Sequence, residues 1–414
     1  MGGAAVARVA VALALAVCAA MAAVVGLPAG GAATNGNPLG APHPAKGPTV
    51  TVAVITDAGR HLGGTGPLVA QGAKAATDYL NEYKFGLAGH KINLYVCENQ
   101  ETPAGGQACG TDVVQKRAVA VAVPFTGEGA TEVPTVVNAG IPFITMNGSS
   151  TAELATSGAF SIEGGLASDL GAMALDAKQR HYSKVVFLVS DQAAAVQGAQ
   201  VLGQLVFHNA GVGFEVMPAN AGVADMTPQL RAAVAGGASA VGLLGSESLC
   251  ASFLQAYKML RTHLPRYLLA TCQDPSILNS PSLDRVFQGS YVAGANAATT
   301  NDKALYAAIL HNYAPQVNTN PSASANEAAG LTAILTLSAL MKGYTGSVTA
   351  ATVLHQAQTA QGVPIPFSGG QTFTCDGKAI PRLTSVCSSS AAVGVVGSGY
   401  TVKGVHVYDP SSLF

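Results

Sequence analysis

The sequence predicts an α/β protein built from two parallel β-sheets. Short apolar runs such as VTVAVIT alternate with stretches of helical periodicity, and the runs are apolar on both faces, as in sheets covered by helices on both sides. The alternation starts again near residue 184. A second series of strands implies a second sheet, and therefore a second lobe.

The first series opens with a buried strand, and Pro67 then begins a helix with apolar residues at helical spacing. The elements expected in this series are a strand at 50–56, a helix from Pro67, a strand at 91–97, a helix at 107–117, a strand at 119–125, a helix from Thr131 and a strand at 140–146.

The second series follows after what we interpret as a short link. Its last fifty residues are strand-like and rich in glycine, which is typical of hairpins. The expected elements are strands at 184–190, 213–218, 238–245 and 266–271, helices through Phe207 and at 225–234, 249–261, 302–313 and 324–342, and hairpins around Cys375 and Cys387.

The first 33 residues have the composition of an export signal. One arginine precedes an uninterrupted apolar run from Val9 to Leu27, and the small residues of PAGGAAT follow. We expect cleavage near Thr34, which makes 1–33 a signal peptide. The alternative is an uncleaved anchor, because about 19 apolar residues can span a bilayer. A lipoprotein signal at Cys18 is disfavoured, since Val17 replaces the small residue required there.

The remaining cysteines indicate an oxidising compartment. Without Cys18 the chain has six, an even number in an exported sequence. Six cysteines allow 15 connectivities, but neighbours in sequence each flank one turn or helix, which favours local bridges. Zinc binding is the alternative, and the sequence lacks CxxC or HxxxH spacing. The predicted disulfides are Cys97–Cys109, Cys250–Cys272 and Cys375–Cys387.

Between the signal and the first strand lies TNGNPLGAPHPAKGP, residues 34–48. This segment has many turn formers and no hydrophobic period, so it predicts a tether, with His43 in solvent and order beginning at Thr49.

Three loops of the first series follow strand ends, at 56–66, 124–132 and 145–154. In open α/β sheets small ligands bind beyond the carboxyl ends of the strands. Each loop combines glycines with hydroxyl or amide side chains, which suits hydrogen bonding to a small polar group. Any one of them is explained as an ordinary βα turn, whereas three at one sheet edge predict a pocket.

Several function classes are disfavoured. Charged residues make up 10% of the chain and nearly cancel, so we expect no nucleic-acid partner. GEGATE and GGTGPL lack the lysine of a P-loop and the spacing of a dinucleotide loop, so no nucleotide cofactor is expected. The sequence also lacks a GxSxG elbow, an HExxH helix and an SxxK motif, and the histidines have no metal-ligand spacing. We therefore expect neither an enzyme nor a bound metal or cofactor.

From Thr49 onward the chain resembles a known family. The succession of VTVAVITDAG, GAKAATDYLNEY, VAVAVPFTGEGATEVPTVVNAGIPFITMNGSSTAEL, KVVFLVSD and ASAVGLLGSES is similar to type I periplasmic binding proteins, in particular the branched-chain amino-acid (leucine, isoleucine, valine) receptor group. The resemblance implies two Rossmann-like lobes joined by three crossover strands. It also implies a solute closed between the lobes and delivery to an ABC transporter permease in the membrane.

The resemblance also carries the ligand site of the family over in part. The first-lobe loops that hold an amino acid in the family fall on residues 126–128 and 147–150. In the second lobe, Ala195 replaces an aromatic lid, Ser246 replaces a tyrosine, and the acid that meets the ligand's ammonium falls near Cys272. Arg60 is a further candidate for binding an anion. The implied ligand-binding residues are Arg60, Thr126, Gly127, Glu128, Asn147, Gly148, Ser149, Ser150, Asp191, Ala195, Ser246, Gln273 and Asp274.

The crossovers are expected near residues 160–163, 291–296 and 364–374. The domain boundaries that follow are 49–160 plus 294–365 for lobe 1, and 161–293 plus 366–414 for lobe 2.

The function implied by the resemblance is an extracytoplasmic solute-binding protein of an ABC importer, located in the periplasm or cell envelope. It captures a small polar solute, amino-acid-like or related, by hinge closure and without reaction. A ligand-binding sensor and an envelope protein of the same fold without a transport role are the alternatives. The chain ends at Phe414 with no membrane-spanning and cytoplasmic part, which favours a stand-alone receptor over a sensor.

Overall fold

A computed structural model describes most of the chain after the expected signal segment. The segment Pro38–Phe414 forms one compact unit and is described by itself. Arg60, Ser246, the predicted signal peptide and part of the second crossover lie outside the described residues. The described residues are 37–57, 66–191, 193–220, 222–245, 247–294, 298–321, 324–398 and 401–414.

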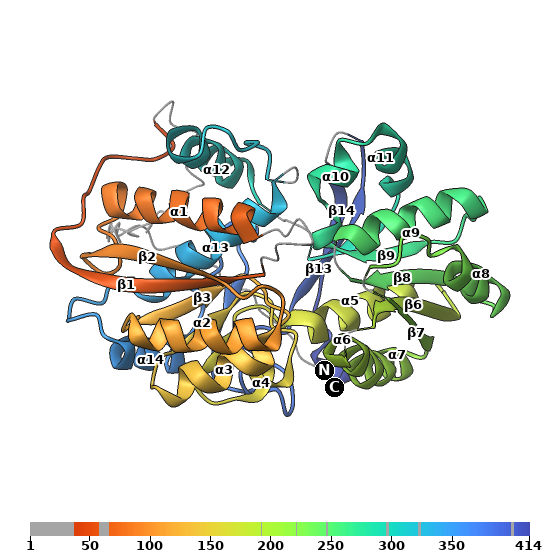
Figure 1. Cartoon of the computed structure of the whole chain (residues 1–414), viewed down its shortest axis with the longest axis horizontal. Helices are drawn as coiled ribbons and strands as arrows, with labels where there is room; N and C mark the ends of the chain where they lie inside the picture. Colours follow the sequence, from red (N-terminus) through yellow and green to blue (C-terminus); the bar gives the residue numbers. More distant parts are fainter. Residues whose placement is uncertain are drawn as a thin grey trace, which may run out of the picture. The chain divides into compact units, whose positions relative to one another are not determined.

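The first sheet has five parallel strands in the order β2-β1-β3-β4-β5 (Figure 1). This is a doubly wound order, in which the direction of winding reverses between β1 and β3. The strands are β1 (Gly47–Thr56), β2 (His90–Glu98), β3 (Ala120–Val123), β4 (Phe143–Thr145) and β5 (Ala159–Ser161).

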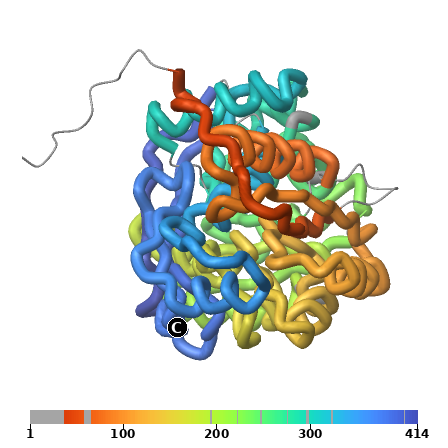
Figure 2. Tube along the Cα trace, turned by 90° about the vertical axis from the view of Figure 1, so that its left-hand side faces the viewer, coloured from red at the N-terminus to blue at the C-terminus, as the bar shows by residue number. Residues whose placement is uncertain are grey.

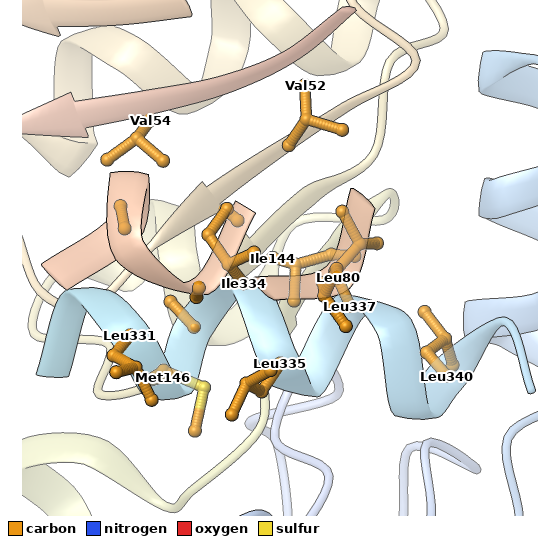
Figure 3. Close-up of a cluster of buried hydrophobic side chains, with 14 of the residues drawn as sticks. Val52, Val54, Leu80, Ile144, Met146, Leu331, Ile334, Leu335, Leu337 and Leu340 are labelled. Carbon is orange, nitrogen blue, oxygen red and sulfur yellow. The ribbon is translucent and has the colours of Figure 1, made fainter. Parts of the chain in front are cut away.

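Strand β1 buries alternate residues against opposite helical layers. Val52 and Val54 pack in one core with α1 (Gly66–Tyr83) and α13 (Ala325–Leu340), and Figure 3 shows both valines in the same cluster as Leu80 of α1 and Ile334 of α13. Ala53 and Ile55 pack on the other face, with helices α2 (Pro103–Gln115) and α3 (Gly129–Asn138). Both faces are therefore covered, which explains the uniformly apolar strand. Three more helices complete this lobe: α4 (Thr151–Ala155), α12 (Thr300–Tyr313) and α14 (Ala350–Gln358).

Helices α1 and α13 approach to backbone contact, because glycines lie at their crossing. A Cβ atom on Gly330 would lie 2.1 Å from the carbonyl oxygen of Val69, and one on Gly72 would lie 1.8 Å from that of Glu327. No real Cβ atom fits at such distances, so both positions require glycine.

The second sheet has seven strands in the order β14-β13-β10-β9-β8-β6-β7. Five strands are parallel and repeat the winding of the first sheet, whereas β13 and β14 are antiparallel additions at one edge, in a hairpin that lies after Cys387 and not around Cys375 and Cys387 as expected. The strands are β6 (Lys184–Ser190), β7 (Gly213–Ala219), β8 (Ala240–Leu244), β9 (Arg266–Leu269), β10 (Tyr291–Ala293), β13 (Ala391–Val396) and β14 (Val402–Tyr408).

Helices cover both faces of the second sheet as well. Val185 and Phe187 of β6 pack against α5 and α7, while Val186 and Leu188 face the side of α8, α9 and α11. The helices are α5 (Gly165–Gln179), α6 (Ala193–Gly198), α7 (Gln204–Ala210), α8 (Thr227–Ala235), α9 (Glu247–Leu260), α10 (Pro275–Leu278) and α11 (Pro281–Phe287), with a π-helical turn at Ala199–Gly203.

The chain passes between the sheets three times, after β5, after β10 and before β13. A two-stranded sheet, β11 (Val363–Pro364) with β12 (Thr372–Phe373), precedes the third passage. Phe367, Phe373 and Cys387 pack in the core of the first sheet, whereas Val393 packs in the core of the second. Core membership therefore places the last change of lobe after Cys387, and corrects the boundary expected at 365–366.

Two other expectations need correction. Residues 38–48, expected as a tether, pack on α1 instead: Leu39 is buried, the Ala45 N–H donates to the Asn81 carbonyl, and the His43 ring stacks on Phe85. Figure 2 shows this segment running beside α1.

The short link expected before β6 contains helix α5, in which most residues are buried. It therefore has no polar stripe to reveal it in the sequence.

All three predicted disulfides are confirmed: Cys97–Cys109, Cys250–Cys272 and Cys375–Cys387. The first ties the end of β2 to α2, and the second ties α9 to the 3-10 turn after β9. Among the helices of the described segments, none is long and apolar enough to cross a bilayer.

Candidate functional site

Polar side chains from three strand ends meet at the point where the winding of the first sheet reverses. Asp57 follows β1, Asn99 follows β2 and Thr126 follows β3. The Asn99 amide donates to Asp57 Oδ1 at 2.6 Å and to Thr126 Oγ1 at 3.2 Å, and the Thr126 hydroxyl lies 3.1 Å from Asp57 Oδ1. A ligand is expected at this position in a doubly wound sheet.

A buried acid from α3 completes the cluster. Glu132 is 0% exposed, and its Oε1 accepts from the Asn99 amide at 2.9 Å and lies 3.1 Å from the Thr126 hydroxyl. Burial raises the pKa of Glu132 to about 8, and the negative charge of Asp57 adds to the shift. One hydroxyl hydrogen cannot serve two carboxylates, so the cluster is most stable with Glu132 protonated at neutral pH.

The loop after β3 gives its backbone donors to these same side chains. The Gly127 N–H donates to Asp57 Oδ2 at 2.8 Å, and the Glu128 N–H donates to the Thr126 hydroxyl at 3.0 Å. Of the three predicted residues in this loop, Thr126 is buried, Gly127 is exposed and the side chain of Glu128 is half-buried. Burial raises the pKa of Glu128, and the nearby charge of Asp57 raises it further.

The loop after β4 is organised around a second buried acid. Glu153 Oε2 accepts the backbone N–H groups of Ser149 and Ser150, at 3.0 and 2.9 Å, and the Ser150 hydroxyl at 2.9 Å. Ser150 is the N-cap of α4 and forms a capping box with Glu153. Ser149 remains exposed, and its hydroxyl donates to the Thr126 carbonyl at 3.1 Å, which links this loop to the one after β3.

Neighbouring residues of the same loop reach the first crossover between the lobes. The Gly148 N–H donates to Ser161 Oγ at 3.0 Å, and the Asn147 amide donates to Asp169 Oδ2 at 3.3 Å. Burial raises the pKa of Asp169 to about 6 and that of Glu163 to about 7, the latter with a contribution from the charge of Asp169. Asn147 and Gly148 thus join the loop to the segment that enters α5.

The second-lobe residues predicted from the family lie in three separate places. Asp191, exposed at the end of β6, accepts from the Asn220 amide at 3.3 Å. Ala195 packs against the core beneath α6. Gln273 is buried, and Asp274 begins α10 and accepts the Ser276 N–H at 2.8 Å. Burial raises the pKa of Glu327 on α13, and the charge of Asp274 adds to this effect.

Several residues of this site were missed in the sequence. Asp57, Asn99, Glu132 and Glu153 anchor the loops; Asp57, Glu132 and Glu153 lie in loops identified as candidates but were not singled out, and Asn99 lies outside those loops. The S-x-x-E spacing of Ser150 and Glu153 signals a capping box, and Asn99 directly follows a strand. Nothing in the sequence places Glu132 against Asn99, because that contact depends on how α3 returns to the sheet.

The carboxyl groups of the site have unused acceptor atoms. Within the part of the chain that the structure describes, Glu132 Oε2 and Glu153 Oε1 are buried and have no hydrogen-bond partner. Over the same residues, no set of three His, Cys, Asp or Glu side chains has the arrangement of a metal site. Both carboxyl oxygens are closed off from solvent, so the acceptor groups of this cluster that a solute can reach are those of the half-buried Asp57 and Glu128.

Comparison with known proteins gives one family match. The family model described as periplasmic binding protein matches residues 49–387. No curated protein sequence matches this chain significantly.

This chain matches several solved structures over nearly their whole length. A leucine-binding protein from Thermotoga maritima matches with a TM-score of 0.70 at 14% identity, over 88% of this chain and 99% of its own. A fatty acid ABC transporter substrate-binding protein from Thermomonospora curvata matches with a TM-score of 0.70 at 13% identity, over 89% and 93%. An R. palustris solute-binding protein in complex with 4-hydroxybenzoate matches with a TM-score of 0.69 at 15% identity, over 88% and 98%.

Proposed function

Because the chain belongs to the periplasmic binding protein family, we propose that it is the extracytoplasmic solute-binding protein of an ABC importer. It captures a small polar solute between its two lobes, closes about the crossovers and releases the solute unchanged to a membrane permease. The observation that carries this proposal is the convergence of the β1, β2 and β3 strand ends on one polar cluster at the winding reversal. Closure needs only that the solute binds the closed form more tightly than the open one.

The chemistry of the first-lobe cluster supports a particular kind of solute. The Gly127 N–H is already bound to the Asp57 carboxylate, so it is not available to a carboxylate of the solute. The remaining carboxyl groups that a solute can reach, those of Asp57 and Glu128, are acceptors when ionised. We therefore propose that the solute presents N–H or O–H donors to this lobe, as an amine, an amide or a polyol does.

The residues implied by the resemblance then divide into two groups. Gly127, Glu128 and Ser149 are exposed or half-buried and would contact the solute. Thr126 and Ser150 are buried and bonded to acids, so their role would be to hold those loops in place. Asp191 and Asp274 are the second-lobe candidates that have a charged side chain.

Thermal unfolding in the presence of single solutes tests this proposal. A panel of amines, amides, polyols, amino acids and simple carboxylic acids would be compared, since a solute at 100 times its Kd adds about 2.7 kcal/mol to the free energy of unfolding. We expect stabilisation by donor-bearing solutes and none by simple aliphatic carboxylic acids. A flat panel would instead support an envelope protein that does not bind solutes.

A variant identifies the site. Asp57→Asn keeps the size of the side chain but removes its charge, so the Kd of the best solute should rise by about tenfold or more, because hydrogen bonds to charged groups contribute about 1.5–3 kcal/mol. Asp78→Asn is the matched control: it removes a carboxylate that pairs with Lys74 on the exposed face of α1. Equal affinities in both variants would place the solute elsewhere.

A further inference from the structure

A cavity lies on the seven-stranded sheet, at the end of α5. Its volume is about 340 Å³, and it is lined by Gln179 and Arg180 of the helix end, Tyr291 of β10, and residues of β13 and β14. None of these residues belongs to the strand-end loops of the first sheet. The volume is at the lower end of the range of about 300–1,000 Å³ found for small-molecule sites, which suits a molecule with one ring.

The sequence creates this space by a bulge in the edge hairpin. Val393 pairs with His406 and Val395 pairs with Lys403, so two residues of β14 lie opposite Gly394 alone. Gly404, one of those two, has a φ of +57° and nothing within 4 Å of the place where a Cβ would be. Bulges of this kind re-aim side chains and are frequent beside functional sites. The cavity is therefore open at Gly404, where another residue in a regular strand would place a side chain.

A buried carboxylate fixes the wall of the cavity. Asp176, on α5, accepts from the Tyr267 hydroxyl at 2.6 Å, the Tyr408 hydroxyl at 2.9 Å and Arg180 Nε at 2.7 Å. The Asp176 side chain is only 3% exposed, so both of its oxygens are used inside the protein. Its charge is thereby matched by Arg180, and the tyrosines hold the arrangement in place.

The outward side of this network carries unused donors. Arg180 uses only Nε in its ion pair, and its guanidinium lies 4.2 Å from the centre of the Tyr291 ring. The Gln179 side-chain amide lies 3.1 Å from the Tyr408 oxygen, whose one hydrogen is donated to Asp176. Within the described segments, neither terminal nitrogen of Arg180 has a hydrogen-bond partner.

We propose that this cavity is a second small-molecule site, selective for a planar carboxylate such as a single-ring aromatic acid. The two terminal nitrogens of an arginine match the two oxygens of a carboxylate. Tyr291 and His406 supply flat surfaces for the ring, and His406 itself lies 4.4 Å from the Tyr408 ring. A cationic solute would meet Arg180 with no free carboxylate to oppose it.

Isothermal titration of the purified protein with benzoate tests this inference, with benzamide as the neutral analogue. We expect benzoate to bind and benzamide to bind at least about tenfold more weakly, the loss expected for a charge-assisted pair. Gln179→Glu should weaken benzoate binding by about tenfold or more, because it adds a negative charge to the wall of the cavity that holds the carboxylate. Gln255→Glu, exposed on α9, is the matched control and should bind as the original protein does.

Three outcomes would overturn the inference. They are no benzoate binding at millimolar concentration, equal binding of benzamide, and an unchanged affinity in Gln179→Glu. A bulky variant of the first-lobe wall, Ser149→Phe, separates this site from the proposed solute site. If Ser149→Phe loses benzoate binding and Gln179→Glu does not, benzoate binds in the first lobe. If instead the first-lobe cluster binds no solute at all, benzoate binding and its dependence on Gln179 should be unchanged.

Discussion

The buried acid Glu132 makes a strong prediction about how stability depends on pH. Its pKa is about 8 in the folded protein because of burial, against an ordinary value of 4.5. A raised folded pKa means that the folded state binds more protons than the unfolded state between these values. Protonated Glu132 therefore makes its full contribution to the free energy of unfolding below pH 4.5. That contribution falls as the pH rises above 4.5 and is lost as the pH passes about 8.

The size of the effect follows from the same two values. Each pH unit between the unfolded and folded pKa changes the free energy of unfolding by about 1.36 kcal/mol. At pH 7 the solution lies 2.5 units above 4.5 and still below about 8, which gives a loss of about 3 kcal/mol relative to acid solution. Glu132 is 0% exposed, so solvent screening does not reduce this figure.

The substitution Glu132→Gln removes the ionisable group and keeps a side-chain oxygen as a hydrogen-bond acceptor. Its side-chain oxygen can still accept from Asn99, and its amide replaces an O–H group that also lacked a partner. We expect the variant to equal the original protein near pH 4.5 and to be more stable by about 3 kcal/mol at pH 7. Acids elsewhere, including Glu163 and Asp169, titrate in both proteins and cancel in the comparison.

Urea denaturation at a series of pH values measures this difference. Exposed Glu98→Gln, in β2, is the control for a change of charge alone. The reasoning is refuted if the free energies of unfolding of the original protein and Glu132→Gln remain parallel from pH 4.5 to 8, since Glu132 would then be ionised in the folded state.

Two further substitutions test the frame around the site. Replacing both Cys97 and Cys109 by alanine opens a link with a sequence separation of 12, and should lower the free energy of unfolding by about 3 kcal/mol in urea denaturation, with no change if the link is unimportant. Gly330→Ala would place a Cβ 2.1 Å from the Val69 carbonyl oxygen, so the helices must separate; we expect a fall in melting temperature of several degrees, for a loss of about 1–3 kcal/mol. An unchanged melting temperature would mean that α1 and α13 do not cross as closely as described.

The order of the elements was largely predictable from the sequence, because each parallel strand is a short apolar run between helices. The strand at 184–190 and the strand at 50–56 were placed within a few residues of β6 and β1. Helix α5 was missed because glycines at 165 and 171 and burial on nearly every side hide its period. Helix α2 begins at Pro103, earlier than expected, with Thr102 as its N-cap.

The candidate site was predictable only at the level of loops. That three loops meet at one sheet edge follows from parallel strands, and the structure joins the loops after β3 and β4 through Ser149 and Thr126. Which side chains face a solute does not follow, because it depends on partners distant in sequence. Thr126 was expected as a ligand contact, yet its hydroxyl is bonded to Asp57, 69 residues earlier.

Closure of the two lobes over a solute is the central claim, and small-angle X-ray scattering measures it most directly. The solute that gives the largest thermal shift would be added to the original protein and to Asp57→Asn. We predict a smaller radius of gyration for the original protein with solute, and a smaller change for the variant at a solute concentration close to the Kd of the original protein. A radius of gyration that stays the same in the original protein at saturating solute would contradict the account.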